Sequence, residues 1–266
     1  MQWVIGDVHG MLAPLEALID AVDETDPHAE LLFAGDYVNR GPDSRGVLEL
    51  LSDIDGARFI RGNHDDVFDL LVNGVCYAPH PSYSDPLNAF AAFQHFGFDR
   101  TLISYGVDPF DIHRAAQQPS LEEIARLCSV VPEHHRRFVR ELPVLIDEKD
   151  LFVAHGFWSP NSTIEAPSIM ERLELDPRLR VQLLWSRYEP EQVTQAKPWT
   201  KHGFFGHTPV DGYPEQLRGG GMLPVVGPQI TLLDTACALI HDGRLTAVCH
   251  EAKLMLQVDR RGNLVG

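Results

Sequence analysis

Several features of membrane, secreted and nucleic-acid-binding proteins are missing from this sequence of 266 residues. No apolar run approaches the ~18 residues of a membrane span, and no basic segment followed by an apolar run suggests a signal peptide. Lys and Arg number 22 against 38 Asp and Glu, which gives a formal charge of -16. We therefore expect no membrane partner, no non-specific nucleic-acid binding and a cytoplasmic protein.

Cysteine is also scarce. The 4 cysteines, Cys76, Cys128, Cys237 and Cys249, are widely scattered, and none belongs to a C-x-x-C pair. Buried, reduced thiols are the expectation for such a pattern. The acidic balance does not exclude nucleotides or phosphoproteins as substrates, because bound metal ions supply positive charge locally.

Three strand–loop–helix units fill the first part of the chain. Each begins with a short apolar run and continues, after a glycine, into an amphipathic stretch: Gln2–Ile5 before Met11–Val22, Leu31–Ala34 before Ser44–Leu51, and Arg58–Arg61 before Val67–Val72. This repetition predicts an α/β fold with parallel strands. The three loops would then meet at the carboxyl edge of the sheet, where such folds bind ligands.

The pattern changes in the middle of the chain. Prolines and aromatic-rich helical stretches, with a capping-box spacing at Ser120–Glu123, predict a helical insertion around residues 76–142. Short β-like runs follow between Leu151 and Val258 and predict a second, more antiparallel sheet. We expect residues 1–266 to form a single domain.

Candidate metal ligands stand in the loop after each predicted strand. The loops are Gly6-Asp-Val-His-Gly10, Gly35-Asp-Tyr-Val-Asn-Arg-Gly41, Gly62-Asn-His-Asp65, His155-Gly156 and Gly206-His-Thr208. A mixture of carboxylate, amide and imidazole ligands suits Mn, Fe, Co, Ni or Zn better than Ca or Mg. One such loop is usually an ordinary turn, but five in series, each after an apolar run, indicate a metal site.

In order and rough spacing, these motifs resemble the series of the phosphoprotein phosphatase branch of the calcineurin-like metallophosphoesterases. The resemblance runs from Ile5 to about Leu245 and is strongest to the bacterial side, which includes phage phosphatases and symmetrical diadenosine tetraphosphate hydrolases. It implies two mixed β-sheets packed as a sandwich with flanking helices. It also implies a metal-dependent phosphoesterase, similar to serine/threonine protein phosphatases.

The same resemblance implies a role for each motif residue. Two divalent ions, expected to be Mn with Fe, Zn, Ni or Co as alternatives, would be held by Asp7, His9, Asp36, Asn63, His155 and His207. Asp36 would bridge the two ions, and the hydroxide between them would attack phosphorus directly. Arg40 and Arg187 would hold the phosphoryl oxygens, and His64 would give a proton to the departing oxygen.

Two residues depart from the family pattern. Asn39 stands where protein phosphatases of the family usually have Asp, whose charge would raise the pKa of His64. We expect Asn39 to accept a hydrogen bond through its carbonyl, to leave His64 less basic and to disfavour alkyl phosphates relative to aryl phosphates and phosphoanhydrides. Ala236 stands where bacterial relatives tend to have Gly, which predicts a backbone angle that tolerates a Cβ.

The leading interpretation is a phosphatase of phosphomonoesters, on Ser/Thr or Tyr of phosphoproteins. The alternative is a hydrolase of diadenosine tetraphosphate or related nucleotide phosphoanhydrides. A nuclease is disfavoured by the charge and by Gly206-His-Thr-Pro209, which lacks the second His of nuclease relatives. An inactive binding module is disfavoured because all six metal positions carry competent residue types.

Two further groups of residues receive ordinary structural roles. The aromatic cluster Phe90, Phe93, Phe96 and Phe98 is expected to pack in the core, with a wall of the substrate cleft as the alternative. Histidines outside the motifs, His134 and His135 among them, are expected to be surface or interior imidazoles.

Overall fold

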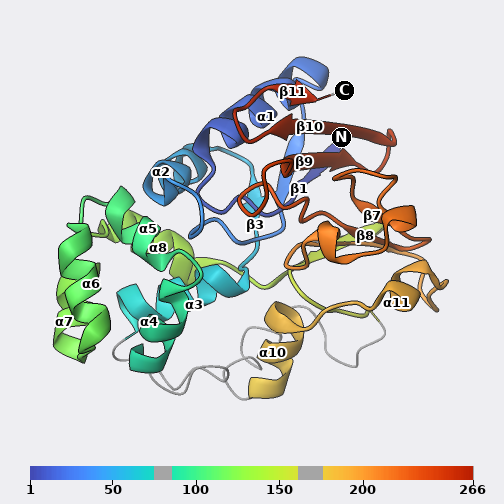
Figure 1. Ribbon diagram of the computed structural model, residues 1–266. Helices are drawn as coiled ribbons and strands as arrows, with labels where there is room; N and C mark the ends of the chain where they lie inside the picture. The colour runs from blue at the N-terminus through green and yellow to red at the C-terminus, as the bar shows by residue number, and fades with distance from the viewer. Residues whose placement is uncertain (75–85, 161–175, 266) are drawn as a thin grey trace.

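A computed structural model describes residues 1–74, 86–160 and 176–265 and arranges them around two β-sheets (Figure 1). The first sheet has the strand order β11–β10–β9–β1–β2–β3. Its strands are β1 Gln2–Ile5, β2 Glu30–Phe33, β3 Arg58–Phe59, β9 Arg244–Cys249, β10 Leu254–Asp259 and β11 Leu264–Val265. β1, β2 and β3 run parallel, whereas β9 lies antiparallel to β1.

The second sheet has the order β4–β5–β6–β8–β7. Its strands are β4 Leu145–Asp147, β5 Leu151–Ala154, β6 His202–Phe205, β7 Val225–Val226 and β8 Ile230–Leu232. β5, β6 and β8 run parallel, and only the edge strands β4 and β7 are antiparallel to their neighbours. The expectation of a more antiparallel second sheet is therefore wrong, because the late hairpin of β9 and β10 pairs with β1 instead.

Helices cover the outer faces of both sheets (Figure 1). Beside the first sheet lie α1 Leu12–Thr25 and α2 Ser44–Asp53, and beside the second lie α10 Pro177–Trp185 and α11 Pro190–Thr194. The predicted fold class, two mixed sheets packed as a sandwich with flanking helices, is confirmed.

The core follows from the alternation of side chains along the strands. On β1, Trp3 and Ile5 point toward the helices, whereas Val4 points into the space between the sheets. There Val4 joins Leu32 of the first sheet and Val153 of the second in one buried cluster. Because β1 and β5 lie inside their sheets, the polar loops that follow them start from fixed strand ends.

The predicted insertion is helical in its described part. Its helices are α4 Pro86–Gln94, α5 Phe98–Ser104, α6 Pro109–Gln117, α7 Leu121–Cys128 and α8 Glu133–Glu141. α4, α7 and α8 pack against α3, Asn63–Asn73, which follows β3, whereas α5 packs against α2. The Ser120 hydroxyl accepts from Glu123 N, as the capping spacing predicts. Residues 76–85 of the predicted insertion lie outside the described residues.

The start of α3 differs from the prediction. The sequence pattern begins this helix at Val67, whereas the structure begins it at Asn63. Asn63 and His64 therefore stand on the first turn of a helix and not in a loop. The helix is buried along 63–72, so no polar stripe reveals its beginning. Asp65 stabilises this first turn by accepting from Gly62 N.

Two simpler expectations concern membranes and thiols. Among the described helices, none combines the length and the apolar character that crossing a membrane requires. Cys128, Cys237 and Cys249 are buried free thiols, as expected, and Cys76 lies outside the described residues.

Candidate metal centre

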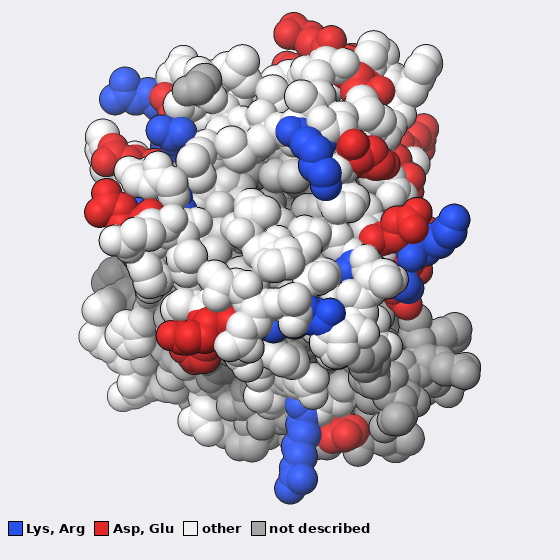
Figure 2. Space-filling model, turned by 90° about the vertical axis from the view of Figure 1, so that its right-hand side faces the viewer, with Lys and Arg blue, Asp and Glu red and all other residues white. Residues whose placement is uncertain are grey.

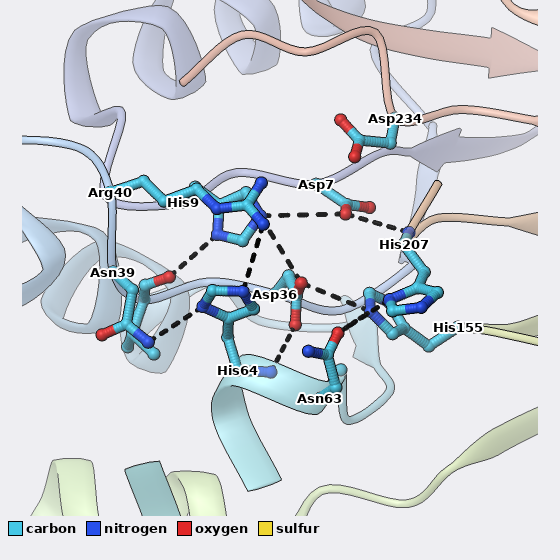
Figure 3. A network of polar contacts seen from close by, with 12 residues as sticks. Asp7, His9, Asp36, Asn39, Arg40, Asn63, His64, His155, His207 and Asp234 are labelled. Atoms are coloured by element: carbon cyan, nitrogen blue, oxygen red, sulfur yellow. Dashed lines mark hydrogen bonds and ion pairs between the residues drawn. The ribbon is translucent and has the colours of Figure 1, made fainter. Parts of the chain in front are cut away.

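Polar residues follow six strand ends and converge in one place (Figure 3). They are Asp7 after β1, Asp36 after β2, Asn63 after β3, His155 after β5, His207 after β6 and Asp234 after β8. Each is at most 7% exposed. Three come from each sheet, so the site exists only where the two sheets pack together.

Asp36 lies at the centre of this cluster. Its Oδ2 is 3.4 Å from His9 Nε2 and 3.3 Å from His155 Nε2. Its other oxygen accepts from His64 N at 2.8 Å. One carboxylate thus faces groups on two sides, which is the position a residue shared between two metal ions requires.

Three histidines are oriented by backbone carbonyls. Nδ1 of His9 is 3.0 Å from the oxygen of Val38, and Nδ1 of His155 is 2.7 Å from that of Ala34. Nε2 of His207 is 3.0 Å from the oxygen of Trp185. A carbonyl only accepts, so each of these ring nitrogens carries the proton. In the neutral form that binds a metal ion, the second nitrogen of each ring presents a lone pair to the centre, as metal-ligating histidines do.

Acceptor atoms face each other at the centre, and this tests whether a cation fits. Oδ1 of Asn63 is 3.0 Å from His155 Nε2 and 2.9 Å from His207 Nδ1, the two nitrogens that present lone pairs. Asp7 Oδ1 is buried and has no hydrogen-bond partner among the described residues. Facing acceptors and an orphaned carboxylate oxygen repel one another unless a cation lies between them. The donor set therefore fits divalent metal ions.

The charges at the site point the same way. Burial raises the pKa of Asp7 well above its ordinary value, and the Asp234 carboxylate adds to the effect. Burial opposes protonation of His155, yet the carboxylate of Asp36 raises its pKa to about 10, so without a cation a proton on Nε2 takes the place that a metal ion would occupy. Without a cation, the cluster holds negative charge together only by taking up protons. Two bound cations would remove that need.

His64 lies between two donors at one side of the centre. Asn39 Nδ2 is 2.9 Å from His64 Nδ1, and Arg40 Nη2 is 3.2 Å from His64 Nε2. Burial, aided by the charge of Arg40 and opposed by the charge of Asp36, lowers the pKa of His64 to about 3. The ring is therefore neutral, and its lowered pKa agrees in direction with the prediction that Asn39 leaves His64 less basic.

The orientation of Asn39 is set by a residue of the insertion. Its carbonyl oxygen accepts from the Thr101 hydroxyl at 2.8 Å, so it is the amide nitrogen that faces His64. The carbonyl thus accepts a hydrogen bond, as expected, but from Thr101 and not from His64. Thr101 belongs to α5, in the insertion, whose side chains the sequence pattern does not place beside the motif.

The two predicted phosphate-binding arginines differ in their surroundings. Arg40 is half-buried beside His64, and its Nη1 is buried with no hydrogen-bond partner among the described residues. Arg187 is exposed and lines a cavity of about 290 Å³ with Tyr188, Thr208 and Tyr213. Arg40 thus belongs to the buried cluster, whereas Arg187 lies at its rim, next to the segment that follows His207. The roles of both stay predictions.

Part of the aromatic cluster borders the centre. Phe93 and Phe96 place their ring centres 5.1 Å and 6.1 Å from that of His64. Phe90, Phe93 and Phe98 are buried, whereas Phe96 is 44% exposed. Phe90 and Phe98 therefore pack in the core, whereas Phe93 and Phe96 form a wall beside the site.

A family model described as calcineurin-like phosphoesterase matches residues 2–216. This chain belongs to the calcineurin-like phosphoesterase family. A symmetrical bis(5'-nucleosyl)-tetraphosphatase of Coxiella burnetii is 37% identical over 87 residues. That match covers 33% of this chain and 29% of the relative, so it spans less than a third of that protein.

Solved structures share the fold. A cold-active protein-tyrosine phosphatase of a psychrophilic Shewanella has a TM-score of 0.54 at 14% identity, over 99% of this chain and 79% of that chain. A metallophosphoesterase from Sphaerobacter thermophilus has a TM-score of 0.50 at 15% identity, over 100% and 88% of the two chains. The family resemblance read from the motifs is confirmed.

In this phosphoesterase family member, the centre is built on unusual backbone angles. His9, Asp36, Asn39, Arg40 and His207 all have positive φ, between 48° and 72°. Such angles cost non-glycine residues free energy and concentrate at functional sites. The backbone at Gly62 also lies so close to the Asp36 side chain that a Cβ added at Gly62 would overlap Asp36 Oδ1.

Two residues of the centre were assigned no role from the sequence. Asp65 accepts from the backbone N–H groups of Asp36 and Tyr37, at 2.7 Å and 2.9 Å, and so fixes the loop that carries Asp36. Asp234 is buried near Asp7, and its Oδ2 has no hydrogen-bond partner among the described residues. The available signal for Asp234 was its place directly after an apolar run, as for Asp7 and Asp36.

Ala236, two residues beyond Asp234, contradicts its prediction. Its φ is 61°, in the left-handed region that favours glycine. The Ala236 N–H donates to Asp234 Oδ1 at 3.0 Å, so the tight turn positions that carboxylate. The backbone angle is thus the one a glycine would adopt, and the alanine bears its strain.

Proposed function

We propose that this chain is a metal-dependent phosphoesterase that hydrolyses phosphate compounds with weakly basic leaving groups. The observation that carries the proposal is the convergence of Asp7, Asp36, Asn63 and the three histidines, with acceptor atoms facing one another around Asp36. When bound, two divalent cations would lower the pKa of water and neutralise phosphoryl charge. Manganese is the expected metal.

Residues of the chain would supply the rest of the chemistry. Arg40 has a buried, unpartnered Nη1 at the edge of the centre and would donate to phosphoryl oxygens, and Arg187 at the rim would bind a more exposed oxygen. His64 is neutral, and its single lone pair accepts from only one of the two donor groups, Asn39 Nδ2 and Arg40 Nη2, that face its nitrogens. It is therefore a poor proton source for a strongly basic leaving group.

This leaving-group argument favours phosphoanhydrides of nucleotides and aryl phosphates over phosphoserine and phosphothreonine. A phosphate chain or a phenol departs without a proton more readily than an alkoxide does. The name of the Coxiella relative, a symmetrical bis(5'-nucleosyl)-tetraphosphatase, supports nucleotide phosphoanhydrides as the first candidate. Phosphotyrosine in proteins is the second candidate, because it shares the aryl leaving group.

Nucleic acid as a substrate receives no support from the charge distribution. On the face shown in Figure 2, separate Lys and Arg side chains lie among acidic and uncharged ones. With a formal charge of -16, the chain would repel the long phosphate backbone of a nucleic acid outside the metal centre.

The test is hydrolysis of four substrates by manganese-loaded protein: diadenosine tetraphosphate, p-nitrophenyl phosphate, a phosphotyrosine peptide and a phosphoserine peptide. We expect turnover of the first three, the highest kcat/KM on the dinucleotide and the lowest on phosphoserine. Asp36→Asn is the inactive control. A higher kcat/KM for phosphoserine than for the other three would contradict the leaving-group argument. No metal-dependent turnover at all would contradict the proposed activity.

A further inference from the structure

A second group of metal-ligating side chains lies outside the centre, between two helices. Glu49 belongs to α2, and His134 and His135 belong to the first turn of α8, a helix that packs against α2 (Figure 1). Their ligand atoms all lie within 4.8 Å of one another. Glu49 Oε2 is 3.5 Å from His134 Nε2 and 3.1 Å from His135 Nε2.

The buried member of this group has a nitrogen without a hydrogen bond. The side chain of His135 has 0% exposure, and its Nε2 makes no hydrogen bond to any described residue. The Glu49 oxygen 3.1 Å away is not aligned with the ring for one. Two ligands of one tetrahedral zinc ion lie about 3.3 Å apart, and each points at the ion and not at its neighbour. The separation and the misalignment at Glu49 are those of a shared ion.

A second contact orients the His135 ring. Nδ1 of His135 and the Tyr105 hydroxyl are 2.8 Å apart, and both groups are buried. A hydrogen bond from Nδ1–H to the hydroxyl leaves the Nε2 lone pair directed at the group. The other two members, Glu49 and His134, have side chains 55% and 48% exposed, so an ion enters from solvent.

We propose that Glu49, His134 and His135 form a separate site for one zinc-like divalent cation. Two imidazoles and a carboxylate, with water as the fourth ligand, are a known zinc coordination set. The ion would link α2 to α8. α2 starts at Ser44, whose hydroxyl accepts from Asn39 N at 3.0 Å, so the link would fix the helix that follows the Asn39–Arg40 segment.

The test counts zinc ions in the wild-type chain and in variants at one buffered micromolar free Zn²⁺. Glu49→Gln and His134→Ala each remove one exposed ligand, and we expect each to bind one ion fewer per chain than the wild type. His113→Ala removes an exposed histidine from α6 and is the matched control with unchanged content. The difference of one ion does not depend on how many ions the first centre holds.

A graded variant separates a metal site from an ordinary ion pair. Tyr105→Phe keeps all three ligands and removes only the contact to Nδ1, so we expect Zn²⁺ affinity at this site to fall about 10–100-fold. Equal zinc content in the wild type, Glu49→Gln and His134→Ala would overturn the proposal. In that case the three side chains form only an ion pair at the surface.

Discussion

Replacing Asn39 by Asp tests how the chain sets its leaving-group preference. The Asn39 amide nitrogen lies 2.9 Å from His64 Nδ1, so a carboxylate oxygen in its place would accept a hydrogen bond from the ring Nδ1–H and stabilise the protonated ring. Opposite charges about 4 Å apart at an effective dielectric constant of about 20 attract by about 4 kcal/mol, or about three pKa units. Measured shifts beside one opposite charge are about one to three units.

The sign of the effect follows from the charge. The pKa of His64 is about 3 with Asn39, and the Asp variant should raise it by about one to three units. At neutral pH the protonated fraction then rises by about 10–1000-fold. Hydrolysis of a phosphoserine peptide should rise by up to that factor, because its leaving group needs the proton most. Hydrolysis of p-nitrophenyl phosphate should change by less than about threefold.

The assay is kcat/KM against pH for both substrates, with wild type, Asn39→Asp and Asn39→Ala at equal metal content. For the phosphoserine peptide, the part of the pH profile in which kcat/KM falls as pH rises should shift to higher pH by about one to three pH units in Asn39→Asp. Asn39→Ala removes the contact without adding charge and should not shift it to higher pH. An unchanged pH profile and an unchanged ratio between the two substrates in Asn39→Asp would refute the reasoning.

Three further substitutions test the fold around the centre. Ala236 has a φ of 61°, which a glycine adopts without strain, so Ala236→Gly should raise the free energy of unfolding by about 0.5–1 kcal/mol in urea titrations. A lower free energy of unfolding would show that the turn does not strain the alanine. Gly62→Ala places a Cβ against Asp36 Oδ1, so the manganese affinity measured by calorimetry should fall at least about tenfold. An unchanged affinity would contradict the close packing at Gly62. Arg61 is buried and donates to Asp66 at 2.9 Å. Arg61→Ala would leave the buried Asp66 partly unpaired and should lower the free energy of unfolding by about 3–5 kcal/mol. A loss below about 1 kcal/mol would contradict this role of Arg61.

The strand-end loops were predictable because each carries its own local signal. Asp7 and Asp36 each follow an apolar run and a glycine, and the runs are strands in the structure. The pairing of β9 with β1 was not predictable in this way, since the two strands are separated by most of the chain. A short β-like run predicts that a strand forms, but it does not predict with which other strand it pairs.

Other parts of the centre depend on contacts that a linear pattern does not contain. The early start of α3 at Asn63 escaped prediction because a helix buried on all sides shows no amphipathic period. The orientation of Asn39 is set by Thr101, 62 positions later. Asp234 and the φ of Ala236 belong to a turn whose strain appears only when the strands are in place.

The central claim is that one carboxylate, Asp36, would be shared by two metal ions when they are bound. Its most direct test is electron paramagnetic resonance of the chain loaded with two equivalents of Mn²⁺. The account predicts the broad spectrum of two exchange-coupled ions in the wild type, and its loss in Asp36→Asn. Only the separate signals of isolated Mn²⁺ in the wild type would contradict the shared centre.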